Sequence, residues 1–477
     1  MILQSCEEKD LSRKTTQLLC SGFFAVLCSG CAVYTPKPLS NTLLSDELGT
    51  PQEAQIRALV SDLPDPLLST VVIDLSDGVG PDEAAVISVV LNPSLRAQRR
   101  SRGISSAEIL NAGLLPDPVF SMSADFPSGG ATAGTINAYG VGLDWAISDL
   151  ITRRARVDAA QLSKGSVDLS ILWSESLVSI QAKALVYSVA SAQQADTLLS
   201  DEVSLLQENV VRIQEALDAG LMTEVDMAAA LASHDVALTQ RTILKEQLEQ
   251  AQISLATLMG FPPDADIRVD VSLDDELDEP PSRLTELLKT MESNRLDLLA
   301  LRQGYESQEA HVRAAILQQF PRLSIGPHFA RDTGNLSTVG FGIGIELPIF
   351  NRNRGEIALA RATRELLADE YAALVHEARS GLAEELNRLR FAQERLGTLR
   401  SAELSQETLV ETYRLGLDRG LVDVLSYYQA RRDMIEIRVA QTQTIADIHR
   451  SRLLIEVLSG DRWNLETENN TKQKESE

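Results

Sequence analysis

Four short stretches of the chain alternate apolar and polar residues with a period of two. They cover residues 119–126, 139–148, 322–329 and 339–349. In the second stretch, Tyr139, Val141 and Leu143 alternate with Gly140 and Gly142. This period is typical of a strand that is buried on one face only. The stretches come in two pairs, with loops at 127–138 and 330–338, so the pattern predicts two β-hairpins that each have one apolar face.

Two long stretches without proline predict long helices. No proline lies between Ser128 and Phe261, or after Ile349. Proline breaks a helix interior, and both stretches are rich in good helix formers. Residues 152 to about 219 alone would form a rod of about 100 Å at ~1.5 Å per residue. Apolar residues follow the heptad spacing of helices that pack side by side: Val203, Leu206, Val210, Ile213 and Leu217 in the first stretch, and Leu382, Leu386, Leu389 and Leu396 in the second.

The chain is a tandem repeat. Gly140 and Gly142 recur 202 residues later as Gly342 and Gly344, and the segment 217–221 recurs 200 residues later as 417–421. Each repeat reads as helix, hairpin, long helix, Gly-Leu turn and returning helix. We expect repeat 1 at 81–261, with strands 117–126 and 138–148 and a tip near 220. A linker or equatorial segment follows at 262–290, and then repeat 2 at 291–460, with strands 321–330 and 338–349 and a tip near 420. A flexible tail is expected at 461–477.

Composition narrows the function. Lys and Arg number 44 against 68 Asp and Glu, a net charge of −24, which argues against nucleic-acid binding. All four cysteines lie in the first 31 residues, so the body holds no disulfide framework and no thiolate zinc site. The five histidines are scattered without ligand spacing. The sequence shows no catalytic motif, so we expect no enzyme, no cofactor and no metal site.

The N-terminus has the pattern of an export signal. Arg13 and Lys14 precede an apolar run that ends before Cys31, and small residues directly before a cysteine resemble a bacterial lipoprotein signal. We expect a signal peptide at 1–30, lipidation of Cys31, and an N-terminal lipoprotein tether at 31–80. The alternative is an ordinary secretory signal. No later stretch reaches the ~18 apolar residues of a transmembrane helix.

The predicted hairpins create a physical problem that other copies of the chain would solve. Two hairpins leave open sheet edges, and a bilayer tolerates none, because every backbone N–H and C=O there needs a partner. Strands of eight to eleven residues have the length that a tilted membrane strand needs. Three chains would supply twelve strands, an even number in the bacterial barrel range.

The repeated hairpin and long helices resemble the TolC-type outer membrane factors over residues 82–460. The motifs that carry the resemblance are Asn92-Pro-Ser-Leu-Arg-Ala, Ala112-Gly-Leu-Leu-Pro-Asp-Pro, Leu255-Ala-Thr-Leu-Met-Gly, Arg295-Leu-Asp-Leu-Leu-Ala, Phe320-Pro-Arg-Leu-Ser, Glu346-Leu-Pro-Ile-Phe-Asn and Gly420-Leu-Val-Asp-Val-Leu. The segment 350–357 resembles heavy-metal-exporting (CzcC-like) members. The resemblance implies a homotrimer with a shared twelve-stranded β-barrel and a periplasmic α-helical coiled-coil tunnel. It also implies a periplasmic adaptor protein and an inner-membrane pump, of RND type, as partners.

The resemblance also implies roles for individual residues. The apolar strand faces would meet outer-membrane lipid, and the polar faces would line the pore with Asp125, Asp144, His328 and Glu346. The alternative is the reverse orientation, with apolar faces packed on helices.

At the two tips, the resemblance implies that Gly220, Leu221, Gly420 and Leu421 contact the adaptor. Glycine there would also simply end a helix. Asp423 matches the first aspartate of a family motif, Asp-Val-Leu-Asp, that lines a closed periplasmic aperture. Ser426 replaces the second aspartate. The alternative is that Asp423 is a plain solvated helix residue.

Two hypotheses for the function follow. The first is a passive outer-membrane efflux duct, lipid-anchored, with a large periplasmic part and with divalent heavy-metal cations or drugs as cargo. The second is a non-transporting coiled-coil envelope lipoprotein that acts as a scaffold or spacer. The alternating strands favour the first, because a spacer has no need of lipid-facing hairpins.

Overall fold

The computed structural model describes residues 33–39, 49, 51–61, 71–273, 284–417 and 419–460. The chain divides into two units, Met1–Gly49 and Thr50–Glu477, and all elements described below lie in the second. The expected signal peptide, Cys31 and the tail at 461–477 lie outside the described residues.

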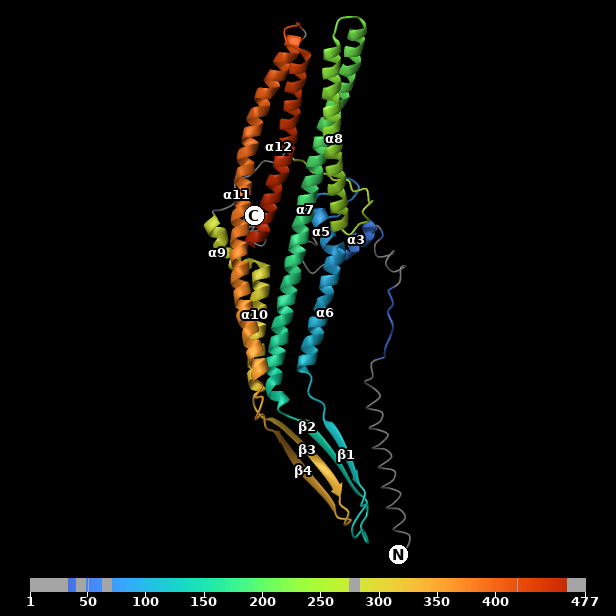
Figure 1. Cartoon of the computed structure of the whole chain (residues 1–477), viewed down its shortest axis with the longest axis vertical. Coiled ribbons are helices and arrows are strands. Elements are labelled where there is room, and N and C mark those ends of the chain that lie inside the picture. The colour runs from blue at the N-terminus through green and yellow to red at the C-terminus, as the bar shows by residue number, and fades with distance from the viewer. Residues whose placement is uncertain are drawn as a thin grey trace, which may run out of the picture. The chain divides into compact units, whose positions relative to one another are not determined.

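Two long helical hairpins dominate the second unit. α7 (Asp149–Asp218) and α8 (Glu224–Leu258) form the first, and α11 (Arg354–Leu417) and α12 (Val424–Ser459) form the second. α7 has 70 residues, or about 105 Å at ~1.5 Å per residue. α6 (Pro93–Gly113) and α10 (Leu296–Leu317) run beside the hairpins towards the sheet, and the helical turns lie at the opposite end (Figure 1). The predicted fold class, mainly helical with a small β part, is confirmed.

The predicted heptad seams are buried where the helices meet. Leu206 and Ile213 of α7 form a cluster with Val424 and Tyr428 of α12, so this seam joins the two repeats. In the second repeat, Leu382, Leu389 and Leu396 of α11 are buried with Ile448 and Ile455 of α12.

Three short helices lie midway along the hairpins: α3 (Glu53–Ser61), α5 (Pro81–Leu91) and α9 (Leu284–Asn294). Ile56, Ile73 and Val79 are buried in one core cluster with residues of α5, α7 and α8. The N–H of Val79 also donates to the carbonyl of Arg268 at 2.8 Å. The described segments 53–61 and 71–80 therefore contribute buried side chains to this core, which differs from the expectation of a tether as far as residue 80.

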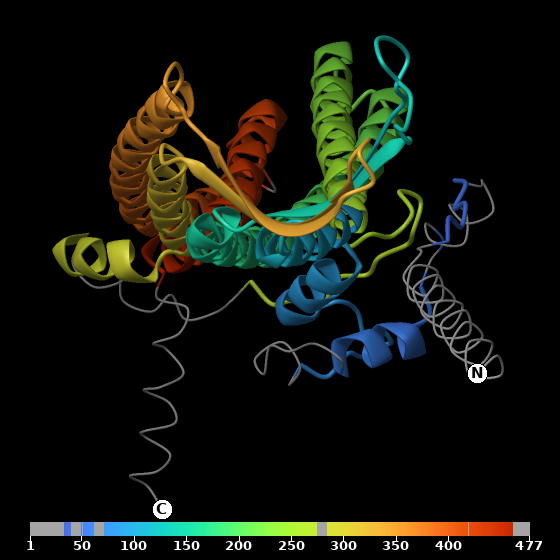
Figure 2. The ribbon, with the colours of Figure 1, turned by 90° about the horizontal axis from the view of Figure 1, so that it is seen from below.

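The four strands form one antiparallel sheet. β1 (Val119–Asp125), β2 (Ala138–Ala146), β3 (Arg322–Arg331) and β4 (Ser337–Glu346) lie in the order β1-β2-β3-β4. The pairing of β2 with β3 joins the two repeats, and β1 and β4 are the two edges. The strand expected at 338–349 ends at Glu346, two residues before Pro348, which has no N–H to donate. Figure 2 shows that the sheet is bent and that the long helices follow the same curve, with α3, α5 and α9 on its outer side.

β2 and β3 approach each other closely at one point. The register pairs Gly142 with His328 and Trp145 with Ile325, without a pair between them. Pro327 lies in this gap and has no N–H to donate. A Cβ atom on Gly326 would overlap the backbone carbonyl of Leu143, so only glycine fits there.

Candidate functional site at the two ends of the helices

The register puts the apolar strand residues on one face of the sheet. Cross-strand pairs include Phe120 with Leu143, Val141 with Phe329, Ile325 with Ile343 and Leu323 with Ile345. Many of these side chains are exposed, for instance Ile343 at 68% and Phe120 at 65%. An exposed apolar face of this extent marks an interaction surface.

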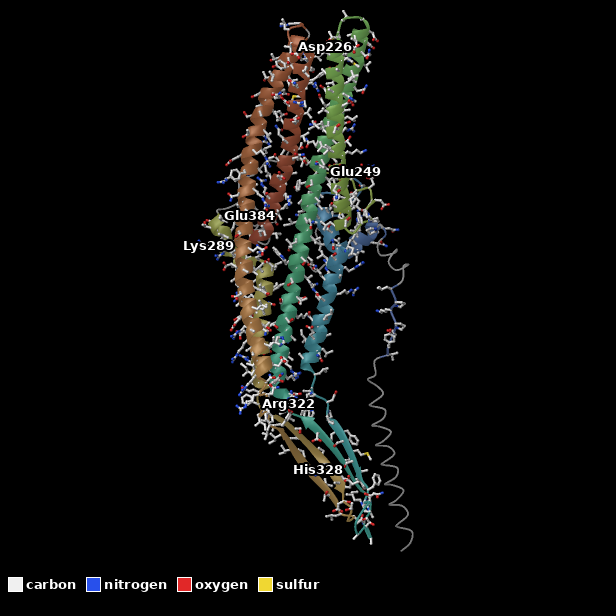
Figure 3. The ribbon with its side chains drawn as sticks, in the orientation of Figure 1. Asp226, Glu249, Lys289, Arg322, His328 and Glu384 are labelled. Carbon is white, nitrogen blue, oxygen red and sulfur yellow. The ribbon has the colours of Figure 1, made fainter. Side chains whose placement is uncertain are left out.

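The opposite face carries all four residues predicted to line a pore. Asp125, Asp144, His328 and Glu346 are exposed there, and Figure 3 labels His328 in the sheet. They do not form a cluster: Asp125 lies at the loop end of the sheet, His328 in the middle, and Asp144 and Glu346 near the helices.

Glycines make this polar face shallow. A Cβ atom on Gly340 would lie 2.5 Å from ring atoms of His328, and one on Gly344 would lie 2.5 Å from Ser324 Oγ. The glycines therefore leave the space that the side chains of the neighbouring strand occupy. A face built in this way combines exposed polar groups with little bulk.

At the other end, both hairpin turns end their first helix in the same way. Gly220 and Gly420 both have φ 71°. The N–H of Leu221 donates to the carbonyl of Ala216 at 2.8 Å, and the N–H of Leu421 donates to that of Gly416 at 2.8 Å. These are the bonds of a Schellman C-cap. The cap leaves Leu221 80% and Leu421 77% exposed, so each tip presents an apolar side chain to solvent.

Asp423 caps the N-terminus of α12. Its Oδ1 accepts from the N–H of Ser426 at 2.9 Å, and Ser426 Oγ donates to Oδ2 at 2.6 Å. The hydrogen bond from the Ser426 side chain is the main reason why the pKa of Asp423 lies below its usual value. Ser426, which replaces the second acid of the family motif, is thus the hydroxyl partner of the cap.

The first repeat contains a similar cap, in which the hydroxyl residue is the N-cap and the carboxylate follows three residues later. Thr223 is the N-cap of α8, its N–H donates to Asp226 Oδ2 at 2.9 Å, and the N–H of Asp226 donates to Thr223 Oγ1 at 3.3 Å. The hydrogen bond from Thr223 lowers the pKa of Asp226, and the nearby charge of Asp423 opposes that shift. Asp226, labelled in Figure 3, is therefore a second tip carboxylate near Asp423. The sequence reasoning missed it, although the 200-residue repeat aligns Thr223 with Asp423.

A buried ion pair joins the two repeats further from the tips. Arg431 of α12 contacts Glu202 of α7 through two hydrogen bonds, of 2.5 Å from Nη2 and 3.3 Å from Nε. Burial lowers the pKa of Arg431, but the hydrogen bond to Glu202 and the charge of that carboxylate contribute to a larger opposite effect, so the pKa lies above its ordinary value. Burial also raises the pKa of neighbouring Tyr428 to about 12. The sequence carries no signal for this pair, because 229 residues separate its members.

A cavity of about 190 Å³ lies between the two hairpins in the same region. Leu199, Leu206 and Ala237 of the first hairpin line it together with Leu425 and Tyr428 of the second. Its walls are mostly apolar, so the space between the hairpins suits an apolar side chain.

The described part of the chain shows no metal centre and no membrane-spanning helix. No group of three or more His, Cys, Asp or Glu residues there could hold a metal ion. Among the described helices, none is both long enough and apolar enough to cross a membrane.

Comparisons with known proteins agree with this architecture. Residues 287–460 match the family model described as outer membrane efflux protein. The cobalt-zinc-cadmium resistance protein CzcC of Cupriavidus metallidurans is 23% identical over 313 residues, which cover 65% of this chain and 73% of CzcC. The outer membrane efflux protein BepC of Brucella suis is 22% identical over 66% of this chain and 70% of its own length.

Solved structures show the same fold. The CmeC outer membrane channel of Campylobacter jejuni superimposes with a TM-score of 0.69 at 15% identity, over 90% of this chain and 94% of CmeC. The second repeat thus matches the outer membrane efflux protein family, and the described fold is that of the TolC-type outer membrane channels. The resemblance stated from the sequence is confirmed.

Proposed function

We propose that this chain is the outer-membrane duct of a tripartite efflux system and conducts its cargo passively. One observation carries the proposal: a bent four-stranded sheet with two free edges and an exposed apolar face extends from long helical hairpins. Such a sheet is unfavourable in water and suits a bilayer, provided that its edges are paired.

Pairing of the edges requires other copies of the chain. β1 of one copy would pair with β4 of the next, and three copies would close a twelve-stranded barrel. The apolar face would then meet lipid, and the face with Asp125, Asp144, His328 and Glu346 would line the pore. We place the assembly in the outer membrane, anchored also by a lipid on Cys31, with the helices in the periplasm.

The helical tips are the proposed contact with a periplasmic adaptor and, through it, with an RND-type pump. The exposure of Leu221 and Leu421, together with the apolar cavity between the hairpins, supports this role. Asp423 would face the aperture, where rings of like charge favour cations. Asp226 would add a second ring in place of the acid that the motif lacks.

Divalent heavy-metal cations are the proposed cargo. The name of CzcC, a cobalt-zinc-cadmium resistance protein, supports this choice, as does the acidic tip. Drugs are the alternative cargo. In such a system the pump selects the substrate, so a duct needs no metal-binding cluster of its own.

Single-channel conductance in a planar bilayer, with the mass of the unheated oligomer measured alongside, tests the proposal. We expect a trimer with discrete, cation-preferring conductance steps. Asp423→Asn should reduce the cation preference, whereas the matched control Glu384→Gln, on an exposed face of α11 (Figure 3), should not. A monomer that never conducts would overturn the proposal and favour a scaffold.

A further inference from the structure

We propose that α6 of one copy packs against α11 of the next copy, with Arg100 beside Glu365 and Ile104 beside Leu359. This inference rests on the proposed trimer and names the helical surface that holds it together.

Both helices present faces without a partner in the described chain. α6 packs mainly on α7, with ion pairs from Arg99 and Arg102, and α11 packs on α9, α10 and α12. Ile104 and Leu110 of α6 are 64% and 67% exposed, and Leu359 of α11 is 62% exposed. The two helices flank the α7–α10 pair on opposite sides (Figure 1). A neighbouring copy could therefore bring one face to the other.

The chain contains a template for such a joint, where repeat 1 meets repeat 2. Ser166 Oγ of α7 donates to the carbonyl of Ala300 in α10 at 2.7 Å, and Ser307 Oγ donates to that of Ala159 at 2.9 Å. Gln303 lies directly over Gly165, where a Cβ atom would overlap its side chain. The two helices thus come close enough for side chains to reach the backbone of the neighbouring helix.

Because α6 corresponds to α10 and α11 corresponds to α7, the contact between α7 and α10 predicts an equivalent contact between α11 of one copy and α6 of the next. Buried Leu95 and Leu298 occupy the same place after the N-caps of α6 and α10. Arg100 therefore corresponds to Gln303, and Ile104 to Ser307. Gly220 and Gly420, at the turns that follow α7 and α11, align the two helices with an offset of 200 residues. Because both helices are uninterrupted, Glu365 corresponds to Gly165 and Leu359 to Ala159. A ring of tandem repeats uses similar joints within and between its chains, so Arg100 falls on Glu365 and Ile104 on Leu359.

The side chains at these positions are complementary. Arg100 and Glu365 carry opposite charges, and neither has an ion pair within the described residues. Ile104 and Leu359 are both apolar and exposed. Opposite charges across an interface fix its register and disfavour wrong pairings. The face of α6 therefore fits the face of α11 on a second copy.

Engineered disulfides test this register on the full chain in membranes. The native cysteines all lie in the first 31 residues, so the wild-type protein gives the background. Under mild oxidation, Ile104→Cys combined with Leu359→Cys should convert most of the protein to covalent trimers on a denaturing gel. The shifted control, Ile104→Cys with Leu366→Cys, moves one cysteine by about 10 Å along the helix, beyond disulfide reach, and should stay near background.

A charge exchange gives an independent readout. Arg100→Glu alone should lower the temperature at which the unheated trimer dissociates in detergent, and adding Glu365→Arg should restore most of that loss. A stable trimer that crosslinks equally at the shifted pair, or not at all at the proposed pair, would overturn this inference. It would not contradict the proposed function as a duct. A monomer in the mass measurement would instead overturn the proposed trimer itself.

Discussion

The ion pair between Glu202 and Arg431 provides the sharpest test of how the two repeats are held together. Glu202 is 5% and Arg431 20% exposed, and their closest atoms are 2.5 Å apart. We expect Glu202→Gln to leave a mostly buried guanidinium without its anion. Loss of one partner of a fully buried pair costs about 3–5 kcal/mol. Because Arg431 keeps some contact with water, we expect about 2 kcal/mol here.

The assay is chemical denaturation followed by the helical circular dichroism signal. Arg431→Gln should destabilise by a similar amount, and the double variant by clearly less than the sum of the two, because neither charge then remains unpaired. Arg432→Gln is the matched control: its partners Asp433 and Glu436 are about half exposed, so we expect a change within ~0.5 kcal/mol. Single variants as stable as this control, or strictly additive losses, would refute the reasoning.

Three further predictions concern the tips and the sheet. Gly420→Ala should destabilise the second hairpin by about 1–2 kcal/mol, seen in thermal melts, because φ is 71° while the space around it is open. The hydrogen bond from Ser426 lowers the pKa of Asp423, so the cap should be intact above the ordinary aspartate range and be lost as pH falls through the lowered pKa. Ser426→Ala should move this loss to higher pH in acid titrations followed by circular dichroism. An unchanged titration would contradict the role of the cap. Gly326→Val should abolish the heat-resistant trimer on gels, because a Cβ atom there overlaps the backbone of Leu143; a normal trimer would contradict this.

The long hairpins and the two faces of the sheet could be predicted because their signals are local. Absence of proline and a heptad period define α7 and α11, and strict alternation defines the sides of β2 and β4. The packed segment before α5 could not be predicted in this way. Ile56 and Val79 have no apolar neighbour on either side, and Ile73 ends a run of only three apolar residues, so none of them belongs to a sustained period. The core that buries them comes from α5, α7 and α8.

In the candidate site, too, the residues with a local sequence signal could be predicted, and the contacts between the two hairpins could not. Asp423 and the two tip glycines are visible in the sequence because each follows a repeated turn signal, and their roles in the duct remain proposals. The pairing of Glu202 with Arg431, and the approach of Asp226 to Asp423, depend on how the two hairpins pack. Contacts between residues about 200 positions apart leave no periodic trace in one sequence.

The central claim is that the sheet spans the outer membrane with its glycine-rich face towards water. Single cysteines along β4 test it most directly, because a Cβ atom at Gly342 meets only ordinary contacts. In intact outer membranes, a water-soluble maleimide should label Gly342→Cys quickly and should leave Phe341→Cys and Ile343→Cys nearly unlabelled. Equal labelling at all three positions, or the reverse alternation, would contradict the account.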